Sequence, residues 1–321
     1  CQEVSRNLQG FFDSLKVLDA LRARPFCILR TSACRATVWN LLMEITPVAK
    51  TLKYIDAGGI QIAAVYDRGR ARDSERQRAA KHRASSAAQR RMNQIYSAQK
   101  LELMLSANFP TPGSALVVTL THDDAHMPKS RKEAQARFKY FLKKLRAARA
   151  AAGLPEPVVF WAPEILTSAS GRWHQHIVLD STGRDFDMLR RCWIYGSDIE
   201  IRRLGRPEPH EPPPAWERDD AEEPDNYYRA VARYMTKEMR ECQEYETRPG
   251  LHGWSCTRNA VRPEIETDVV PDDFELTPPE GCRIYIDESK KTEWASYRVI
   301  KFRFEAHLAA PRPARRRRRP R

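Results

Sequence analysis

Two histidines separated by one residue form the most chemically informative pattern in this sequence. His174 and His176 lie in the segment 171–180, where a turn-like stretch precedes them and an apolar Ile-Val-Leu run follows. That composition is typical of a β-strand. Side chains alternate between the two faces of a strand, so both imidazoles would project from the same face. Two such imidazoles could bind one metal ion, and the simpler alternative is a pair of exposed strand histidines.

A carboxylate that could complete such a site precedes the histidines. The apolar segment 158–164 also has the composition of a strand, and it ends at Glu164. A hairpin centred near Ala169 would set Glu164 opposite His174. Two imidazoles and one carboxylate leave coordination positions open for phosphate. The predicted metal ligands are therefore His174, His176 and Glu164, and the expected ion is Mg²⁺ or Mn²⁺.

A tyrosine and a lysine further along the chain could supply a nucleophile and a cation. Tyr234 and Lys237 are three residues apart, so they would share one face of a helix. A tyrosine hydroxyl can attack a phosphodiester when a metal ion and a nearby cation neutralise the non-bridging oxygens. Tyr140 and Lys143 repeat the pattern, but Tyr140 adjoins the apolar face of a core-type helix and precedes the histidines. Taken alone, Tyr234 is better interpreted as an ordinary residue of an amphipathic helix.

Strands and helices alternate around these residues. The predicted elements of this region are a buried strand over 114–122, a basic amphipathic helix over 130–152, a helix over 187–195, a strand over 198–203, and a helix capped by Asp225-Asn226 that contains Tyr234. A Pro-rich loop over 205–221 precedes that last helix.

The flanking regions contain further predicted elements. These are a hairpin over 53–66 with Gly58-Gly59 as its turn, a helix from Met92 to Pro110, a short acidic linker after Pro263, and a strand pair around 283–286 and 297–304.

Composition and charge indicate the kind of partner. The chain has 321 residues, enough for one large or two modest domains, and 55 Lys+Arg against 42 Asp+Glu give a net charge of +13. Such an excess favours a polyanionic partner, and the Arg-rich tail 312–321 would bind phosphate without sequence preference. The Arg-rich stretch 68–91 would either contact phosphate in the same way or form a solvated charged face. We find no apolar run of about 18 residues and no signal-peptide pattern, so we expect neither a membrane span nor secretion. The seven cysteines are odd in number and contain no C-x-x-C pair, which argues against a zinc ribbon and a disulfide scaffold, so we expect a reducing cytosol.

The order of these motifs resembles a known family. A strand ending in Thr-Leu-Thr, a helix, a hairpin with His-x-His, and a later helix with Tyr-x-x-Lys are together similar to the rolling-circle replication initiators of the HUH endonuclease superfamily, particularly those of single-stranded DNA phages and related plasmids. The resemblance runs from about Ser106 to Pro263 and includes Ala107-Asn108-Phe109 before the first strand and 254–263 after the tyrosine helix.

This resemblance implies a fold and a division of the chain. The fold would be α+β, of HUH endonuclease type, with a central antiparallel sheet of about five strands, flanking helices and the metal site on one face. The predicted parts are an N-terminal helical segment of unknown role over 1–46, a basic extension and helix over 47–105, the HUH endonuclease domain over 106–263, a strand-containing segment over 264–310 and a disordered Arg-rich tail over 311–321.

The resemblance also implies an activity. His174, His176 and Glu164 would bind the metal ion, Tyr234 would be the nucleophile, and Lys237 would orient the phosphate or the tyrosine helix. The protein would nick and rejoin single-stranded DNA at a replication origin through a 5′-phosphotyrosyl intermediate, in the cytoplasm of a bacterial host. Host helicase and polymerase would be further partners, because the chain has no nucleotide-binding motor motif.

The sequence departs from the family in two places. The family prefers a bulky apolar residue between the histidines, whereas residue 175 is Gln, which would leave the back of that strand less well packed. Many phage members have a second catalytic tyrosine four residues from the first, but Ala230 and Glu238 occupy those positions. We therefore predict a single-tyrosine enzyme, with Tyr227, about two turns before Tyr234, as a candidate second nucleophile.

Three other functions share some of these features. A transposase or plasmid relaxase would use the same chemistry, although relaxases usually place the tyrosine before the histidines. A nucleic-acid-binding protein without catalysis would account for the charge alone. A hydrolytic metallonuclease would cleave without staying attached to its product.

Overall fold

The computed structural model describes residues 49–67, 87–164, 171–205, 223, 226–241, 252–291 and 296–304. They form two antiparallel five-stranded sheets with helices, which confirms the α+β class. The helices are α3 (Ala87–Asn108), α4 (Arg131–Ala151), α5 (Asp185–Cys192), α7 (Tyr227–Thr236) and α8 (Glu238–Glu241), with a short 3-10 turn η1 (Asp124–His126). The predicted helical segment 1–46, most of the first Arg-rich stretch, the centre of the 158–180 hairpin, nearly all of the Pro-rich loop and the Arg-rich tail lie outside the described residues.

The sheet that contains the two histidines has the strand order β6-β3-β5-β4-β7. Its strands are β3 (Ala115–Thr121), β4 (Val159–Glu164), β5 (His174–Asp180), β6 (Ile199–Arg203) and β7 (Ser255–Cys256). In the β4–β5 pair, Glu164 lies opposite His174, as the hairpin predicted.

Each face of this sheet packs against its own helices. On one face, Leu120 and Ile177 join Phe138 of α4 and Leu189 of α5 in one buried cluster. The opposite face packs against α3 and α7 in a second cluster, which includes Val178. Both faces are covered, which explains why β3 and the Ile177–Leu179 part of β5 are apolar runs rather than alternating ones.

The helix predicted over 187–195 begins and ends earlier than expected. It is α5, Asp185–Cys192, and the first-turn residue Asp185 fixes its start, because its carboxylate accepts a hydrogen bond from the Thr182 N–H at 2.6 Å. The chain leaves the helix at Trp193, which is buried beneath the sheet. Trp193 and Tyr195 therefore belong to a loop that packs on the core, not to a further helical turn.

A second sheet was not predicted. Its order is β8-β1-β2-β10-β9, with strands β1 (Ala49–Asp56), β2 (Gln61–Asp67), β8 (Glu264–Pro271), β9 (Cys282–Lys291) and β10 (Ser296–Phe304). The predicted hairpin and the predicted strand pair are both present, and they join through β2 and β10. The expected acidic linker after Pro263 is wrong: these residues form β8, an edge strand on β1.

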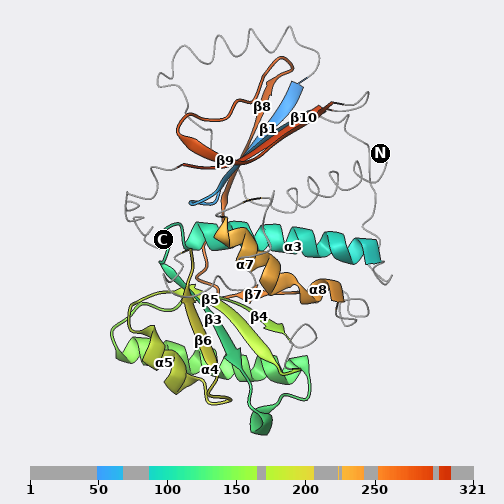
Figure 1. Cartoon of the computed structure of the whole chain (residues 1–321). Coiled ribbons are helices and arrows are strands. Elements are labelled where there is room, and N and C mark those ends of the chain that lie inside the picture. The colour runs from blue at the N-terminus through green and yellow to red at the C-terminus, as the bar shows by residue number, and fades with distance from the viewer. Residues whose placement is uncertain are drawn as a thin grey trace, which may run out of the picture.

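Helices α3 and α7 lie between the two sheets, as Figure 1 shows. The cluster they form contains Ile55 and Ile60 from the second sheet together with Leu101 and Leu105 of α3. A buried ionic group adds to this packing: Lys301 Nζ of β10 lies 2.5 Å from a carboxylate oxygen of Glu102 and 2.6 Å from one of Glu223. Burial opposes ionisation of Glu223, but the charge and hydrogen bond of Lys301, together with Arg229 and Asn226, outweigh it and lower the pKa of that carboxyl.

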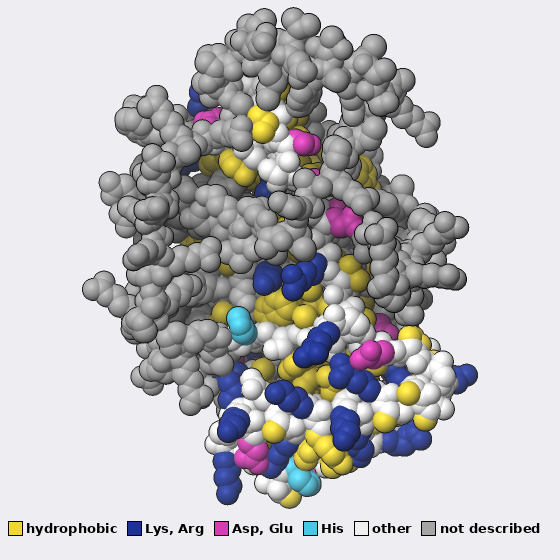
Figure 2. All heavy atoms as spheres, turned by 180° about the vertical axis from the view of Figure 1, so that it is seen from behind, with side chains coloured by type: hydrophobic (Ala, Val, Ile, Leu, Met, Phe, Trp, Pro, Cys, Tyr) yellow, Lys and Arg dark blue, Asp and Glu magenta, His cyan; other side chains and the backbone are white. Residues whose placement is uncertain are grey.

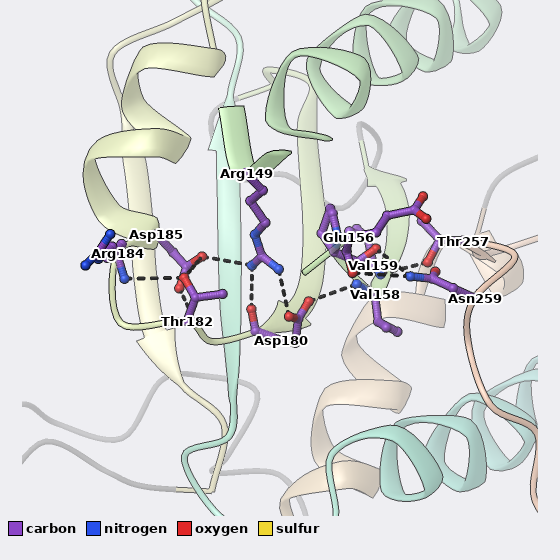
Figure 3. Close-up of polar contacts among 11 residues, drawn as sticks. Arg149, Glu156, Val158, Val159, Asp180, Thr182, Arg184, Asp185, Thr257 and Asn259 are labelled. Carbon is purple, nitrogen blue, oxygen red and sulfur yellow. Dashed lines mark hydrogen bonds and ion pairs between the residues drawn. The ribbon is translucent and has the colours of Figure 1, made fainter. Parts of the chain in front are cut away.

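A second buried ionic group fixes the end of β5 that lies away from the histidines. Arg149 of α4 is fully buried and bonds Asp180, the last residue of β5, at 2.7 Å and Asp185 at 2.8 Å (Figure 3). Asp180 also accepts a hydrogen bond from the Val158 N–H at 2.8 Å. One arginine thus connects α4, β5 and α5. Across the described parts of the chain, no helix is long and apolar enough to cross a membrane.

Candidate functional site

The site lies on the α7 side of the first sheet, where three strands present polar side chains together. Alternation along β5 turns His174 and His176 to the same face as Val178. In β3, Thr119 and Thr121 occupy the matching positions of that face, and their hydroxyls contact the two histidine rings. This end of the sheet face is therefore polar, whereas the rest of the face is part of the apolar core.

Glu164 connects the strands to the helix above them. One of its carboxylate oxygens contacts His176 Nε2, and the other lies 2.7 Å from Lys237 Nζ. The side chains of His176 and Glu164 are each 4% exposed, whereas that of Lys237 is 23% exposed. The carboxylate is therefore almost buried between an imidazole and a cation that still reaches water.

Helix α7 brings Tyr234 to this carboxylate. Asn226 caps the helix by accepting a hydrogen bond from the Arg229 N–H, and Val231 and Met235 bury the inner face against α3 and the sheet. The Tyr234 ring then packs edge-on against His176, with the ring centroids 4.7 Å apart.

Lys237 closes the group immediately after α7. It keeps a helical backbone conformation as the C-cap, so the three-residue spacing still places it beside Tyr234. Its Nζ lies 3.7 Å from the centre of the Tyr234 ring. One ammonium thus contacts both the aromatic ring and the Glu164 carboxylate.

The electrostatics of the site set the protonation of two groups. Burial, followed by the carboxylates of Glu164 and Glu200, raises the pKa of the Tyr234 hydroxyl well above its ordinary value, so the hydroxyl is protonated at neutral pH. Burial and the adjacent His176 lower the pKa of His174. The His174 imidazole is accordingly neutral near pH 7, the state in which a ring nitrogen can bind a metal ion.

The predicted ligands fit a divalent cation by type and proximity. His176 and Glu164 are in contact, and the His174 ring lies beside His176 with centroids 6.2 Å apart and planes 21° from parallel. Two imidazoles and a carboxylate suit Mg²⁺ or Mn²⁺ with open positions. Within the described ranges, however, no group of three or more His, Cys, Asp or Glu side chains is arranged so that it could hold a metal ion. Here the cation next to Glu164 is the Lys237 ammonium.

The other two candidate tyrosines lie elsewhere. The Tyr227 hydroxyl donates to Tyr228 at 3.2 Å, and Tyr228 in turn donates to the Phe109 carbonyl. Tyr227 lies seven residues, or about 10 Å along the helix axis, from Tyr234. Tyr140 is 48% exposed on α4, on the opposite side of the sheet.

Two features of the site were missed or only partly foreseen in the sequence. Thr119 and Thr121 were not predicted as site residues, although their alternation in a strand was a usable signal because it matches that of the histidines. Gln175 was expected to disturb the back of β5. It is fully buried, and its amide oxygen and nitrogen have no hydrogen-bond partner among the described residues.

The fold and site together define an α+β protein in which a sheet face with two histidines and a glutamate meets a helix with a tyrosine and a lysine. Comparison of the chain with protein-family models, with curated proteins and with solved structures gave no match in any of the three.

Proposed function

We propose that this protein is a site-specific, metal-dependent single-strand DNA endonuclease and strand transferase that initiates rolling-circle replication. The observation that best supports this is the meeting of Tyr234 and Lys237 with His176 and Glu164. They come from segments far apart in the chain, and the Lys237 ammonium contacts both the tyrosine ring and the carboxylate. A tyrosine beside a cation and potential metal ligands is an arrangement suited to phosphoryl transfer.

In the proposed reaction, Tyr234 attacks a phosphodiester of the origin strand. A bond forms between the tyrosine oxygen and phosphorus while the bond from phosphorus to the 3′ oxygen breaks. The hydroxyl gives up its proton, and the departing 3′ oxygen takes one up, which leaves a 5′-phosphotyrosyl adduct and a free 3′-OH for a polymerase. Attack by a 3′-OH on the adduct reverses these changes and rejoins the strand.

The roles of the other residues follow from their positions. Lys237 would neutralise a non-bridging phosphate oxygen and hold the Tyr234 ring. His174, His176 and Glu164 would hold a divalent ion, which when bound would polarise the scissile phosphate as a Lewis acid. The raised pKa of Tyr234 means that the hydroxyl needs added positive charge nearby before it becomes an effective nucleophile.

The charge of the chain supports a nucleic-acid substrate. The net charge is +13, and Figure 2 shows Lys and Arg side chains gathered over the lower part of the molecule, which includes α4. Lys132, Lys139 and Lys143 are exposed on that helix. Such a surface would bind the DNA backbone with a strong dependence on salt. Single-stranded DNA is the substrate we propose, with host helicase and polymerase as further partners.

The test is a search for a covalent adduct. The protein is incubated with Mn²⁺ and a pool of single-stranded oligonucleotides of randomised sequence, labelled either at the 3′ end or at the 5′ end. On denaturing gels, the 3′ label should migrate with the protein, because the adduct retains the 3′ fragment, and the 5′ label should be released. Tyr234→Phe should abolish the adduct, whereas the matched variant Tyr227→Phe should preserve it.

Each other result assigns a different function. An adduct that persists in Tyr234→Phe would move the nucleophile to another residue. Cleavage without an adduct would indicate a hydrolytic metallonuclease. Binding without cleavage by Mn²⁺ or Mg²⁺ would indicate a nucleic-acid-binding protein without catalysis.

A further inference from the structure

The Thr-Leu-Thr end of β3 matches the His-Gln-His start of β5 residue by residue. Thr121 pairs with His174, and Thr119 pairs with His176. The side chains meet as well: Thr121 Oγ1 lies 3.0 Å from His174 Nδ1, and Thr119 Oγ1 lies 3.3 Å from His176 Nδ1. Both Nδ1 atoms therefore face a threonine hydroxyl of the neighbouring strand.

This contact can determine which nitrogen of each ring has the hydrogen. A neutral imidazole has one N–H and one lone pair, and the hydrogen bond at one nitrogen fixes the state of the other. If His174 Nδ1–H donates to the Thr121 hydroxyl oxygen, the lone pair is on Nε2. Only in that tautomer can Nε2 of His174 bind a metal ion.

The backbone of Thr121 is held on both sides by the loop after α5. The Thr121 N–H donates to the Asp198 carbonyl at 3.1 Å, and the indole N–H of Trp193 donates to the Thr121 carbonyl at 3.1 Å. Gly196 approaches so closely that a Cβ there would lie 2.2 Å from the Thr121 carbonyl oxygen. Because the backbone of Thr121 is fixed, its side chain can set the orientation of the His174 ring.

We infer that Thr121 is a positioning residue that holds His174 as the Nδ1–H tautomer, in which the lone pair is on Nε2, the nitrogen that would bind the metal ion. The tautomer of His176 does not depend on Thr119, because His176 Nε2 already contacts the Glu164 carboxylate. The Thr119 hydroxyl can donate to Nδ1 of His176 or accept from it. Metal binding by the Nε2 lone pair of His174 rests on the proposed function, whereas the tautomer of His174 is a property of the metal-free protein.

The first experiment reads the tautomer directly. Long-range ¹H–¹⁵N correlation spectra of the metal-free, ¹⁵N-histidine-labelled full chain distinguish Nδ1–H from Nε2–H, and the His174→Gln variant assigns the His174 signals. We expect Nδ1–H for His174 in the unaltered protein and in Thr121→Ser, which keeps the hydroxyl. In Thr121→Val the signals should shift toward Nε2–H, while Thr51→Val, a matched change in β1, should have no effect.

The second experiment measures Mn²⁺ affinity by calorimetry with the same proteins. Thr121→Val should weaken binding by about tenfold or more, and Thr121→Ser should restore most of it. An Nε2–H signal for His174 in the unaltered protein overturns the inference without any variant. If the His174 tautomer changes in Thr121→Val but the Mn²⁺ affinity does not, the proposed role of Thr121 in metal binding is refuted. Failure of the unaltered protein to bind Mn²⁺ would instead refute the metal site of the proposed function. The tautomer of His174 would still be decided by the spectra of the metal-free protein.

Discussion

Removing the positive charge of Lys237 should destabilise the protein because it takes the ammonium away from the almost buried Glu164 carboxylate. We consider Lys237→Met, which keeps the length of the side chain and its packing on the Tyr234 ring. The carboxylate would keep its contact with His176. This prediction concerns the folded state and can be tested without substrate.

The geometry sets the size of the effect. At a separation of 2.7 Å, the attraction between the two charges is about 6 kcal/mol for an effective dielectric constant of about 20, before the cost of desolvation is subtracted. Breaking a fully buried pair costs about 3–5 kcal/mol. Because the Lys237 side chain is 23% exposed, water can partly replace it, so we expect a loss of about 2–3 kcal/mol in the free energy of unfolding.

Equilibrium urea unfolding of four proteins measures the coupling: the unaltered chain, Lys237→Met, Glu164→Gln and the double variant. The neutral amide of Glu164→Gln needs no cation, so in that background Lys237→Met should have little effect. Lys237→Arg serves as the control that keeps a cation. A loss below about 0.5 kcal/mol with no coupling between the two sites would place the pair among ordinary surface ion pairs and refute the reasoning.

Three further predictions concern the elements that support the site. Arg149→Met should lower the free energy of unfolding by about 3–5 kcal/mol because it leaves Asp185 buried without its cation, and urea unfolding showing under about 1 kcal/mol would contradict this. Gly196→Ala should force the backbone away from the Thr121 carbonyl and lower both thermal stability and Mn²⁺ affinity, whereas an unchanged melting temperature would mean that the loop yields freely. Burial lowers the pKa of His122 to about 4, so the unfolded chain binds more protons below pH 6.5 and stability should fall between pH 6.5 and 4 by up to about 3 kcal/mol. Urea unfolding across that range should show a weaker dependence in His122→Phe, and equal slopes for both proteins would refute the assignment to this residue.

The parts of the site that the sequence could predict are those governed by short-range rules. Strand alternation put His174 and His176 on one face, the hairpin register put Glu164 opposite His174, and helical spacing put Lys237 beside Tyr234. Each of these follows from a fixed period along the chain. The contact of Lys237 with Glu164 joins separate elements, and no local period specifies it.

The second sheet shows the same limit at the level of the fold. Its hairpin and strand pair were predicted, but nothing local to β2 or β10 indicates that they pair across more than two hundred residues. Strand β8 was mistaken for a linker because Glu264, Glu266 and Asp268 dominate its sequence. It is an edge strand, and acidic side chains on an edge strand are compatible with pairing on one side while they discourage pairing with another chain.

The histidine strands and the tyrosine helix are far apart in the sequence, so their contact depends on what holds the helix in place. The second sheet contributes to this. Tyr234 can meet His176 only if α7 keeps its place on the first sheet, and the start of α7 is held from the opposite side. Its cap residue Asn226 donates to Glu102 of α3 at 2.8 Å and also contacts Glu223, and Lys301 of β10 binds both carboxylates. Because the side chains of Lys301 and Glu102 are nearly buried, displacing Lys301 would take the cation away from the Glu102 carboxylate. The second sheet thus helps to fix the helix that presents Tyr234, even though it contributes none of the side chains around His176 that make up the site.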